Sequence, residues 1–403
     1  MIRKVAIVHT DFRIYWPARL HAFRELLADK GIAMLVIEIS GKGSPYAFAG
    51  DTIHEKTQWN CLFRNMEMER IDPAQAVQAV FEQLDEFSPD VVVAGAIAFP
   101  GGAAAARWGM INKTPVVIFD DARLEDVQRA AVVNYVKKSI YSTVSAVFIP
   151  APSHDSTYMY YGFSVDQIYY GLNCIDNHFF VADSVSGNGV IQDGIPPRRY
   201  FLAVGRQITK KNMVSLLHAF KHVADHSAIK SWSLVFIGDG PDHEQLMADA
   251  GDLMGDRVIF LPFMTQAALR RYFTDAGALV LPSLGETWGL VVNEAMASGL
   301  PVLVSDKCGC AKTLVDDGVN GFVFNPDDQS AIENVLVKFA KLSLEKRREM
   351  GDASSKIISD WGLDRFCSGM WNACVFADAR PEKKGSIAGQ VLVRLWNGRY
   401  RPV

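Results

Sequence analysis

The residues with the clearest chemical potential lie in one stretch, from Leu279 to Val304. Two carboxylates, Glu286 and Glu294, stand in it with seven residues between them. A turn and the expected start of a helix separate the two acids, and the N–H groups of a helix start attract anions. This arrangement suits a ligand that carries both hydroxyls and phosphates. The alternative is that Glu286 is a solvated loop acid and Glu294 an ordinary charge on a helix face.

The elements around these acids form a strand, a polar loop, a helix and a second strand. An apolar run precedes Pro282, Thr287 is a plausible N-cap, and Gly299 fits a left-handed helix end. Pro301 then opens another apolar strand. In parallel sheets, ligands bind beyond the carboxyl ends of the strands. Glu286 is therefore predicted at a ligand-binding edge, with the N–H groups of residues 288–291 beside it.

Three further loops are predicted at the same edge. Gly205-Arg206 ends one strand and Lys211 opens the next helix, a cation pair that could bind a diphosphate, although two ordinary surface cations are the alternative. Gly238-Asp239-Gly240-Pro241 is a turn whose missing side chains would let a ligand approach the backbone. Phe263-Met264 offers an apolar wall for a flat base. Their convergence favours one binding site over four unrelated loops.

Strands alternate with helices through both halves of the chain, which predicts two doubly wound parallel sheets. The strands of the second half are predicted at Tyr200–Val204, Trp232–Ile237, Arg257–Leu261, Ala278–Leu281, Pro301–Val304 and Gly321–Phe324. Those of the first half are predicted at Arg3–Val8, Ala33–Ile39, Asp90–Gly95, Pro115–Phe119, Ser145–Ile149 and Gln167–Tyr170. Ser40–Glu69 is predicted to be an irregular excursion outside the sheet, and Glu125–Ser139 a helix.

The first half contains polar residues at strand ends but no dinucleotide fingerprint. The loop after its first strand has no glycine, which argues against a nicotinamide or flavin oxidoreductase. His9, Asp11 and Arg13 follow that strand, and Asp120-Asp121 follows a later one. Adjacent acids are most often turn formers, so a functional role for the pair is the less frequent case.

Length and composition limit the number of domains and the class of protein. The 403 residues suggest two domains of about 200 residues each. Hydrophobic residues make up 49% of the chain, and the net charge of -4 does not suggest nucleic-acid binding. The six cysteines do not resemble a secreted disulfide framework. Pro100-Gly101-Gly102 interrupts the most apolar run, and the first residues are a poor signal peptide, so we expect a soluble cytoplasmic protein.

The domain boundary is predicted in the stretch 183–197, which is rich in Gly, Ser, Asp and Pro. We assign 1–182 to a first domain and 183–364 to a second, with 365–403 packing back on the first. Lys137-Lys138, Arg19, Arg24, Trp16 and Tyr15 could make a peripheral contact with the inner face of the cytoplasmic membrane. A solvated helix surface is the alternative reading of those residues.

The second half resembles the large family of retaining glycosyltransferases numbered four, also called glycosyl transferases group 1, which have the GT-B fold. The motifs that carry the resemblance are Gly205-Arg206 with Lys211-Asn212, Ile237 to Pro241, Val258–Met264, Glu286 to Glu294, Gly299 to Val302 and Gly318 to Phe322. They cover nearly all of the second half, whereas the first half matches in pattern only. The resemblance implies two Rossmann-like domains facing across a cleft, with nucleotide sugar bound by the second and acceptor by the first.

The resemblance also implies a role for each matching residue. Arg206 and Lys211 would stabilise the departing diphosphate, Glu286 would bind hydroxyls of the donor sugar, and Glu294 the ribose. The remaining donor-side residues are Gly205, Gly238, Phe263, Met264, Trp288, Gly289 and Leu290, and the acceptor-side residues are His9, Asp11, Arg13 and Asp120, with Asp121 as a further catalytic candidate. Because fixed cations supply the charge, no divalent metal or other cofactor is expected. Retention would proceed by front-face attack within an ion pair.

We therefore predict a metal-independent, retaining hexosyltransferase that uses a UDP- or GDP-linked sugar and a glycan or lipid-linked acceptor, in surface polysaccharide or lipopolysaccharide synthesis. The chain departs from the family in lacking a glycine pair after its first strand, and in having Asp120-Asp121 where a histidine often occurs. Two alternatives stay open: a nucleotide-sugar epimerase or hydrolase on the same fold, and a non-catalytic nucleotide-sugar-binding assembly partner.

Overall fold

The computed structural model describes residues 1–43, 59–181, 199–380 and 385–400. Close contacts divide the chain into two compact units. The first unit comprises Met1–Cys174 and Leu363–Val403, and the second comprises Ile175–Gly362. The predicted linker at 183–197 lies outside the described residues, so the boundary between residues 182 and 183 stays a prediction.

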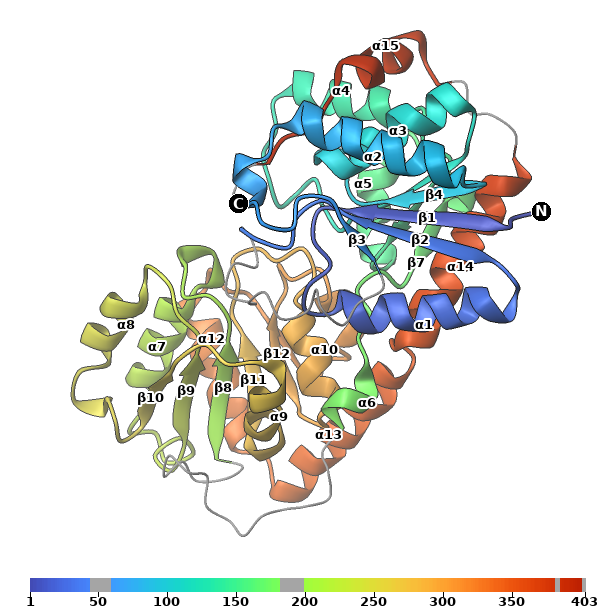
Figure 1. Ribbon diagram of the computed structural model, residues 1–403. Coiled ribbons are helices and arrows are strands. Elements are labelled where there is room, and N and C mark those ends of the chain that lie inside the picture. Colours follow the sequence, from blue (N-terminus) through green and yellow to red (C-terminus); the bar gives the residue numbers. More distant parts are fainter. Residues whose placement is uncertain (44–58, 182–198, 381–384, 401–403) are drawn as a thin grey trace. The chain divides into compact units, whose positions relative to one another are not determined.

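The first unit contains a seven-stranded parallel sheet in the order β3-β2-β1-β4-β5-β6-β7. Its strands are β1 (Lys4–His9), β2 (Ala33–Glu38), β3 (Asn60–Cys61), β4 (Val91–Ala94), β5 (Val116–Phe119), β6 (Ala146–Ile149) and β7 (Ile168–Tyr170). Its α-helices are α1 (Trp16–Asp29), α2 (Pro73–Phe87), α3 (Pro100–Asn112), α4 (Ala131–Tyr141), α5 (Asp155–Tyr160), α14 (Leu363–Ala379) and α15 (Ile387–Leu395). Figure 1 shows α2 and α3 on one face of this sheet and α1 with α14 on the other.

The second unit contains a six-stranded parallel sheet in the order β10-β9-β8-β11-β12-β13. Its strands are β8 (Tyr200–Val204), β9 (Ser233–Ile237), β10 (Val258–Leu261), β11 (Ala278–Leu281), β12 (Val302–Ser305) and β13 (Gly321–Phe324). Its α-helices are α6 (Asn177–Phe180), α7 (Met213–His222), α8 (His243–Ala250), α9 (Gln266–Asp275), α10 (Leu290–Ala297), α11 (Ala311–Leu314), α12 (Gln329–Ala340) and α13 (Leu344–Ser359). Short 3₁₀ turns complete both units.

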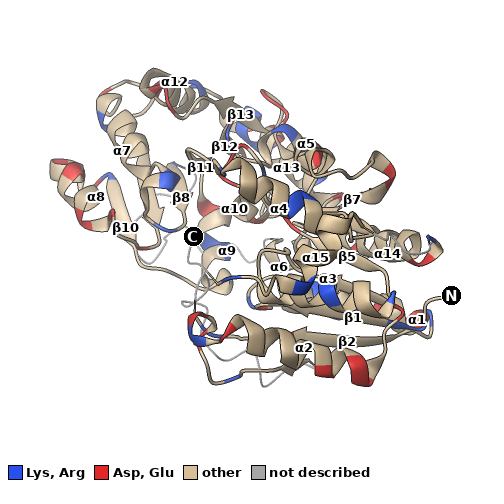
Figure 2. Cartoon of the chain, turned by 90° about the horizontal axis from the view of Figure 1, so that it is seen from above, with Lys and Arg blue, Asp and Glu red and all other residues tan. Residues whose placement is uncertain are grey.

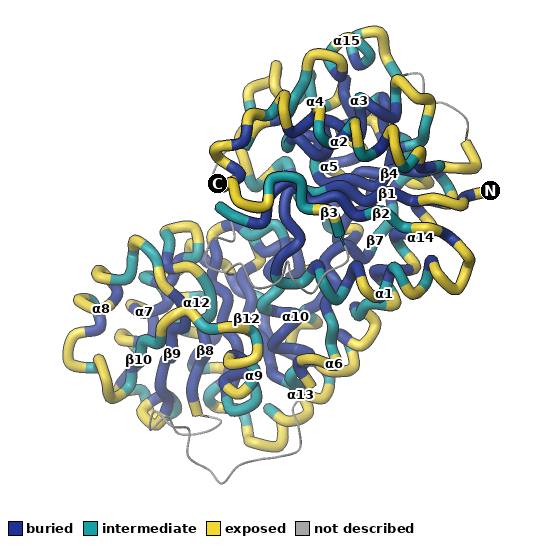
Figure 3. Tube along the Cα trace, viewed as in Figure 1, coloured by how far each residue is buried: buried dark blue, intermediate teal, exposed yellow. Residues whose placement is uncertain are grey.

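Buried strands form the centre of each unit. β4, β5, β6 and β11 consist entirely of buried residues, because the helices cover the apolar side chains that point to either face (Figure 3). Lysines and arginines are interspersed with acids along exposed helices such as α1 and α8 in the view of Figure 2. This mixture of signs agrees with the small net charge and gives the helices solvated outer faces.

Helix α14 returns the chain to the first unit. Gly369 lies so close to β7 that an added Cβ would stand 2.1 Å from the carbonyl oxygen of Tyr170. Phe366, Met370 and Cys374 are buried on the same helix. The absence of a side chain at Gly369 therefore lets the helix rest directly on the edge of the sheet.

Three local predictions were wrong. Ser40–Glu69 is not wholly outside the sheet, because Asn60 and Cys61 pair in parallel with Ile37 and Glu38. The helix predicted from Glu125 begins at Ala131. Arg123 forms ion pairs with Glu125 and Asp126, which holds those acids in the preceding turn.

The third correction concerns the start of α10. The helix begins at Leu290 and its N-cap is Gly289 rather than Thr287. Gly289 has φ +102°, and an added Cβ would lie 2.9 Å from the Leu281 side chain. Close packing of the turn on β11 therefore sets the helix start, while Gly299 adopts the predicted left-handed conformation at the other end, with φ +74°.

Candidate active site

The strand order of the second sheet reverses between β8 and β11, which are neighbours although the chain runs from β8 through β9 and β10 first. Such a reversal opens a crevice beyond the carboxyl ends of the strands, because the two following loops leave in opposite directions. The loop after β8 contains Gly205, Arg206 and Lys211, and the loop after β11 contains Glu286. The predicted cation pair and the first predicted acid therefore flank the point at which ligands bind in this class of sheet.

An ion pair joins the two loops across this point. Lys211 Nζ contacts Glu286 Oε2, and the side chains are 19% and 20% exposed, so both remain in reach of solvent. Leu284 N also donates to Lys210 O at 2.9 Å, which fixes the spacing of the loops. Arg206 is exposed and forms no ion pair within the described ranges. A ligand with phosphates and hydroxyls could thus exchange contacts with the Lys211–Glu286 pair and recruit Arg206.

The glycine turn after β9 serves the packing of loop on loop. An added Cβ at Gly238 would stand 2.1 Å from Gly205 O, and one at Gly240 would stand 2.3 Å from Gln207 O. Both glycines also have positive φ, +132° and +157°. The sequence suggested that these glycines make room for a ligand, whereas the structure shows that they first make room for the β8 loop.

Gln207 locks these loops together and was missed by the sequence analysis. Its fully buried side chain donates from Nε2 to Gly238 O at 2.9 Å and accepts at Oε1 from His243 Nδ1 at 2.6 Å. The carbonyl oxygen of Gln207 also accepts a hydrogen bond from Asp242 N at 3.0 Å. The only signal in the sequence was its place directly after Arg206, at the end of a strand.

The second acid, Glu294, is 3% exposed on α10. Gln266 Nε2 donates to its Oε1 at 2.9 Å. A buried carboxylate needs such donors, because removing its charge from water is otherwise costly. Gln266 stands at the start of α9, just after Phe263 and Met264, of which Phe263 is 48% exposed. Sequence reasoning did not identify Gln266 as a partner.

The turn before α10 exposes its backbone at the site, whereas the large side chain of Trp288 is buried in the second unit. Trp288 is 1% exposed, donates from Nε1 to Asn293 Oδ1 at 2.9 Å, and has its ring 5.6 Å from that of Trp361. Only its backbone, with that of Gly289 and Leu290, is left for the anion contact that the sequence predicts. The first N–H groups of a helix lack intrahelical partners, so this contact has suitable donors.

The residues predicted on the acceptor side belong to the first unit. The order of the first sheet reverses between β1 and β4. His9 is the last residue of β1, and Gly95 follows β4, so both residues lie at this reversal point. The imidazole lies 4.9 Å from the Phe119 ring and 5.4 Å from those of Phe12 and Trp16, measured between centroids. Burial and then the charge of Arg19 lower the pKa of His9 to about 3, so its ring is neutral at physiological pH.

The other polar residues of this side are largely engaged with one another. Arg13 Nε donates to Asp11 Oδ2 at 2.7 Å, and both side chains are buried. Asp120 accepts from the Tyr141 hydroxyl at 2.9 Å. Asp121 accepts from Asn173 Nδ2 at 3.4 Å. Asp11 and Asp120 are thus hydrogen-bonded to neighbouring side chains of the first unit. Their predicted contacts with the acceptor stay predictions.

The basic and aromatic set suggested for a membrane contact does not form one surface. Trp16 and Arg19 are buried, and Arg19 Nε donates to Cys174 O at 2.8 Å. Lys137 and Lys138 instead lie over the rings of Tyr161 and Tyr160, at 5.2 and 5.8 Å. Of the helices that the structure describes, none combines the length and hydrophobicity of a membrane span. Within the same ranges no three His, Cys, Asp or Glu side chains are grouped to hold a metal ion.

Residues 192–357 match the family model described as glycosyl transferases group 1. The chain carries a glycosyl transferases group 1 domain. This domain includes Arg206, Lys211, Glu286 and Glu294, which confirms the resemblance that the sequence motifs indicated.

Curated relatives match over less than half of this chain. The sulfoquinovosyl transferase of Arabidopsis thaliana is 32% identical over 177 residues, 42% of this chain and 32% of the relative. The O-antigen chain mannosyltransferase of Salmonella typhimurium is 35% identical over 145 residues, 34% of this chain and 38% of the relative. The chain therefore spans about a third of the length of these relatives.

Solved structures match over nearly the whole chain. An Anabaena protein in complex with UDP and glucose superposes with a TM-score of 0.70 at 17% identity, covering 92% of this chain and 98% of the other. The fold that accompanies the glycosyl transferases group 1 domain is thus GT-B, and the predicted fold class is confirmed.

Proposed function

We propose that the chain is a retaining glycosyltransferase that moves a sugar from a nucleoside-diphosphate sugar to a glycan or lipid-linked acceptor. The observation that carries the proposal is the Lys211–Glu286 ion pair across the reversal point of the second sheet, with Arg206 beside it. Cations on one loop and a carboxylate on the other are what a diphosphate joined to a hydroxylated sugar requires. The glycosyl transferases group 1 domain supports the same assignment.

Some of the site residues contact the diphosphate leaving group, and others contact the sugar, the ribose and the base. Arg206 and Lys211 stabilise the negative charge that develops on the diphosphate as the glycosidic bond breaks, and such electrostatic stabilisation supplies most of the rate enhancement in many enzymes. Glu286 releases Lys211 to the diphosphate and accepts hydrogen bonds from the sugar hydroxyls. Glu294, oriented by Gln266, accepts from the ribose, and the Phe263–Met264 ledge holds the base. Because the fixed cations supply charge, the transfer needs no divalent metal.

The proposal also specifies the donor and the biosynthetic process in which the enzyme acts. We propose a UDP- or GDP-linked hexose, supported by the Anabaena structure that contains UDP and glucose. The O-antigen relative supports a setting in surface polysaccharide or lipopolysaccharide synthesis. The acceptor is then carried on a lipid, and a peripheral contact at the inner membrane face would bring the enzyme to it.

The first experiment is a thermal-shift screen against UDP-, GDP- and ADP-sugars, because a ligand that binds the folded state raises its melting temperature. Turnover of the donor so identified is then measured with Arg206→Ala and Glu286→Gln. Each is expected to lose about a hundredfold, the usual effect of removing one stabilising group from a transition state. Arg348→Ala and Glu345→Gln, exposed in the same unit, are the matched controls.

Product analysis separates this proposal from its rivals. A new glycosidic bond to the acceptor, with the anomeric configuration of the donor, supports transfer, whereas a free epimer or free sugar formed without acceptor indicates an epimerase or hydrolase. If both site variants kept wild-type turnover, the assignment of this site would be wrong. Donor binding without any turnover would identify an assembly partner instead.

A further inference from the structure

The loop that follows β4 lies at the reversal point of the first sheet. This β4 loop, residues 95–99, leaves the sheet between β1 and β4. An added Cβ at Gly95 would stand 2.3 Å from His9 Nδ1, so the loop begins directly beside the end of β1. Ligands of parallel sheets bind at such reversal points, beyond the carboxyl ends of the strands. The β4 loop therefore lies where the proposed function requires the acceptor to bind.

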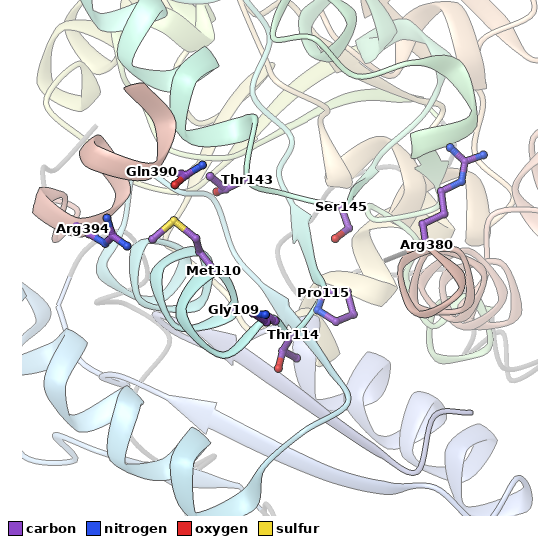
Figure 4. A pocket seen from close by; sticks show the side chains of 10 residues that line it. Gly109, Met110, Thr114, Pro115, Thr143, Ser145, Arg380, Gln390 and Arg394 are labelled. Carbon is purple, nitrogen blue, oxygen red and sulfur yellow. The ribbon is translucent and has the colours of Figure 1, made fainter. Parts of the chain in front are cut away.

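Helix α15 brings the end of the chain back to this loop. The helix packs on α3 and α4, and an added Cβ at Gly389 would stand 2.2 Å from the carbonyl oxygen of Ser139 on α4. Arg394 of α15 and Met110 of α3 line one pocket, which Figure 4 shows from close by. After α15 the chain continues as a tail, residues 396–400. The contacts of α15 thus direct this tail along the first unit.

The tail is hydrogen-bonded to the main chain of the β4 loop. Trp396 Nε1 donates to Ile97 O at 2.7 Å. Arg399 N donates to Ala98 O at 2.8 Å. Both acceptors are backbone carbonyls of consecutive residues. The two bonds therefore fix the orientation of two successive peptide planes of the loop.

Two further features hold the tail against the loop. Arg107 on α3 donates from Nη2 to Trp396 O and to Asn397 Oδ1, both at 2.8 Å. Hydrogen bonds from a charged donor are stronger than those between neutral groups. Gly398 has φ +74°, and an added Cβ would lie 2.4 Å from the carbonyl carbon of Phe99. The missing side chain at Gly398 therefore allows the tail to lie directly on the backbone of the loop.

The β4 loop can offer an acceptor little besides its backbone. Its sequence, Gly-Ala-Ile-Ala-Phe, contains no polar side chain, and the Ile97 side chain is buried. Hydrogen bonds from the loop to a sugar must therefore use its peptide groups, which bind only in the direction that each peptide plane has. Because the tail fixes two of these planes, it controls what the loop offers to an acceptor.

We propose that the tail is a positioning element of the acceptor site, which holds the β4 loop in the orientation that binds the acceptor. Trp396, Gly398 and Arg399 act on the loop directly, and Arg107 acts through the tail. The inference rests on the proposed function, because the acceptor of that reaction is the ligand. Disturbing the tail is expected to weaken use of the acceptor and to leave donor binding, which belongs to the second unit, unchanged.

Gly398→Ala forces the tail and the loop apart. An ordinary contact between carbon atoms is about 3.5 Å, so the 2.4 Å separation from Phe99 must grow by about 1 Å. A misplacement of about 1 Å can cost a hundredfold in rate, so kcat/KM for the acceptor is expected to fall about tenfold or more. Gly31→Ala is the matched control in the same unit, because Gly31 has φ +68° but nothing within 4 Å of an added Cβ. It should keep the acceptor kinetics of the wild type.

Two measurements accompany these kinetics. Hydrogen–deuterium exchange of residues 95–107 reports on the loop without any turnover, and it should be faster in Gly398→Ala than in Gly31→Ala. The acceptor probes are octyl glucoside, octyl galactoside and octyl mannoside, with the donor found by the thermal-shift screen. The rise in melting temperature caused by that donor should be the same in both variants, since a merely structural defect would lower acceptor and donor use together.

Trp396→Phe is the second variant and replaces the first if Gly398→Ala does not fold. It keeps an aromatic ring but removes the donor to Ile97 O, so the acceptor KM is expected to rise about fivefold. Trp108→Phe, which removes an indole hydrogen bond to Asp85 on α2, is its control. Equal acceptor kinetics, or equal loop exchange, for a tail variant and its control would overturn the proposal and leave the proposed function intact. A wild-type enzyme that binds the donor but turns none of it over would instead refute the proposed function, and this inference with it.

Discussion

Replacing Gly238 with alanine tests whether loop packing, rather than ligand access, explains the glycine turn after β9. The added Cβ would stand 2.1 Å from Gly205 O, whereas an ordinary C···O contact is about 3.3 Å, so the loops must separate by about 1.2 Å. Overpacking of this kind costs about 1–3 kcal/mol. Holding alanine at φ +132° costs roughly 1–3 kcal/mol more. The sum is about 2–6 kcal/mol of unfolding free energy.

Thermal unfolding measures this loss directly. A domain of this size shifts its melting temperature by about 2–4 °C per kcal/mol, so Gly238→Ala is expected to lower it by on the order of 10 °C. Gly255→Ala is the matched control, because Gly255 has φ +83° but nothing within 4 Å of an added Cβ. That variant should lose only the conformational part, about 1–2 kcal/mol.

The same comparison extends to function. Displacing Gly205 also displaces Arg206 and Lys211, so Gly238→Ala should give a smaller stabilisation by the nucleotide sugar than Gly255→Ala does. Equal melting temperatures for the two variants would refute the packing argument. Equal ligand-induced shifts would show that the β8 loop does not hold the ligand.

Two further predictions concern buried polar groups. Gln266→Leu removes the 2.9 Å hydrogen bond to the buried Glu294 carboxylate; a bond to a charged group is worth about 1.5–3 kcal/mol, so the donor KM should rise about tenfold or more while kcat changes less. Gln78→Leu, which breaks a similar but exposed Gln–Glu bond to Glu82, is the control and should leave KM unchanged. His9 has an ordinary pKa of 6.5 that folding lowers to about 3, so the unfolded chain binds the extra proton between these values. Stability contributed by neutral His9 is therefore complete above pH 6.5 and falls by about 1.4 kcal/mol per pH unit below it. Melting curves between pH 7 and 5 should show a smaller loss for His9→Phe than for the wild type, and parallel losses would contradict the assignment.

The alternation of strands and helices was readable from the sequence because both sheets are parallel and buried. Continuous apolar runs bounded by Gly, Pro and Asp mark such strands, and β8 and β11 begin and end where the pattern placed them. The strand ends then located Arg206, Lys211 and Glu286, since parallel strands bring their carboxyl ends to one edge.

The errors arose where distant residues override local preferences. Thr287 is a good N-cap by type, yet contact with Leu281 moves the helix start to Gly289. Gln266 and Gln207 look like ordinary polar residues, because their partners Glu294 and Gly238 stand far away in the sequence. No local pattern reports such a pairing.

The return of the chain through α14 has a consequence for synthesis on the ribosome. The second unit, Ile175–Gly362, is one continuous segment, whereas the first unit needs Leu363–Val403 to cover the sheet begun at residue 4. Between Cys174 and Val403 lie 403 − 174 = 229 further residues, which take about 10–45 s to synthesise at 5–20 residues per second. During that interval the apolar face of β4 to β7 awaits Phe366 and Met370, so the unit that starts first is completed last. Chaperones that bind exposed apolar strands are therefore expected to associate with the first half of the nascent chain rather than with the second.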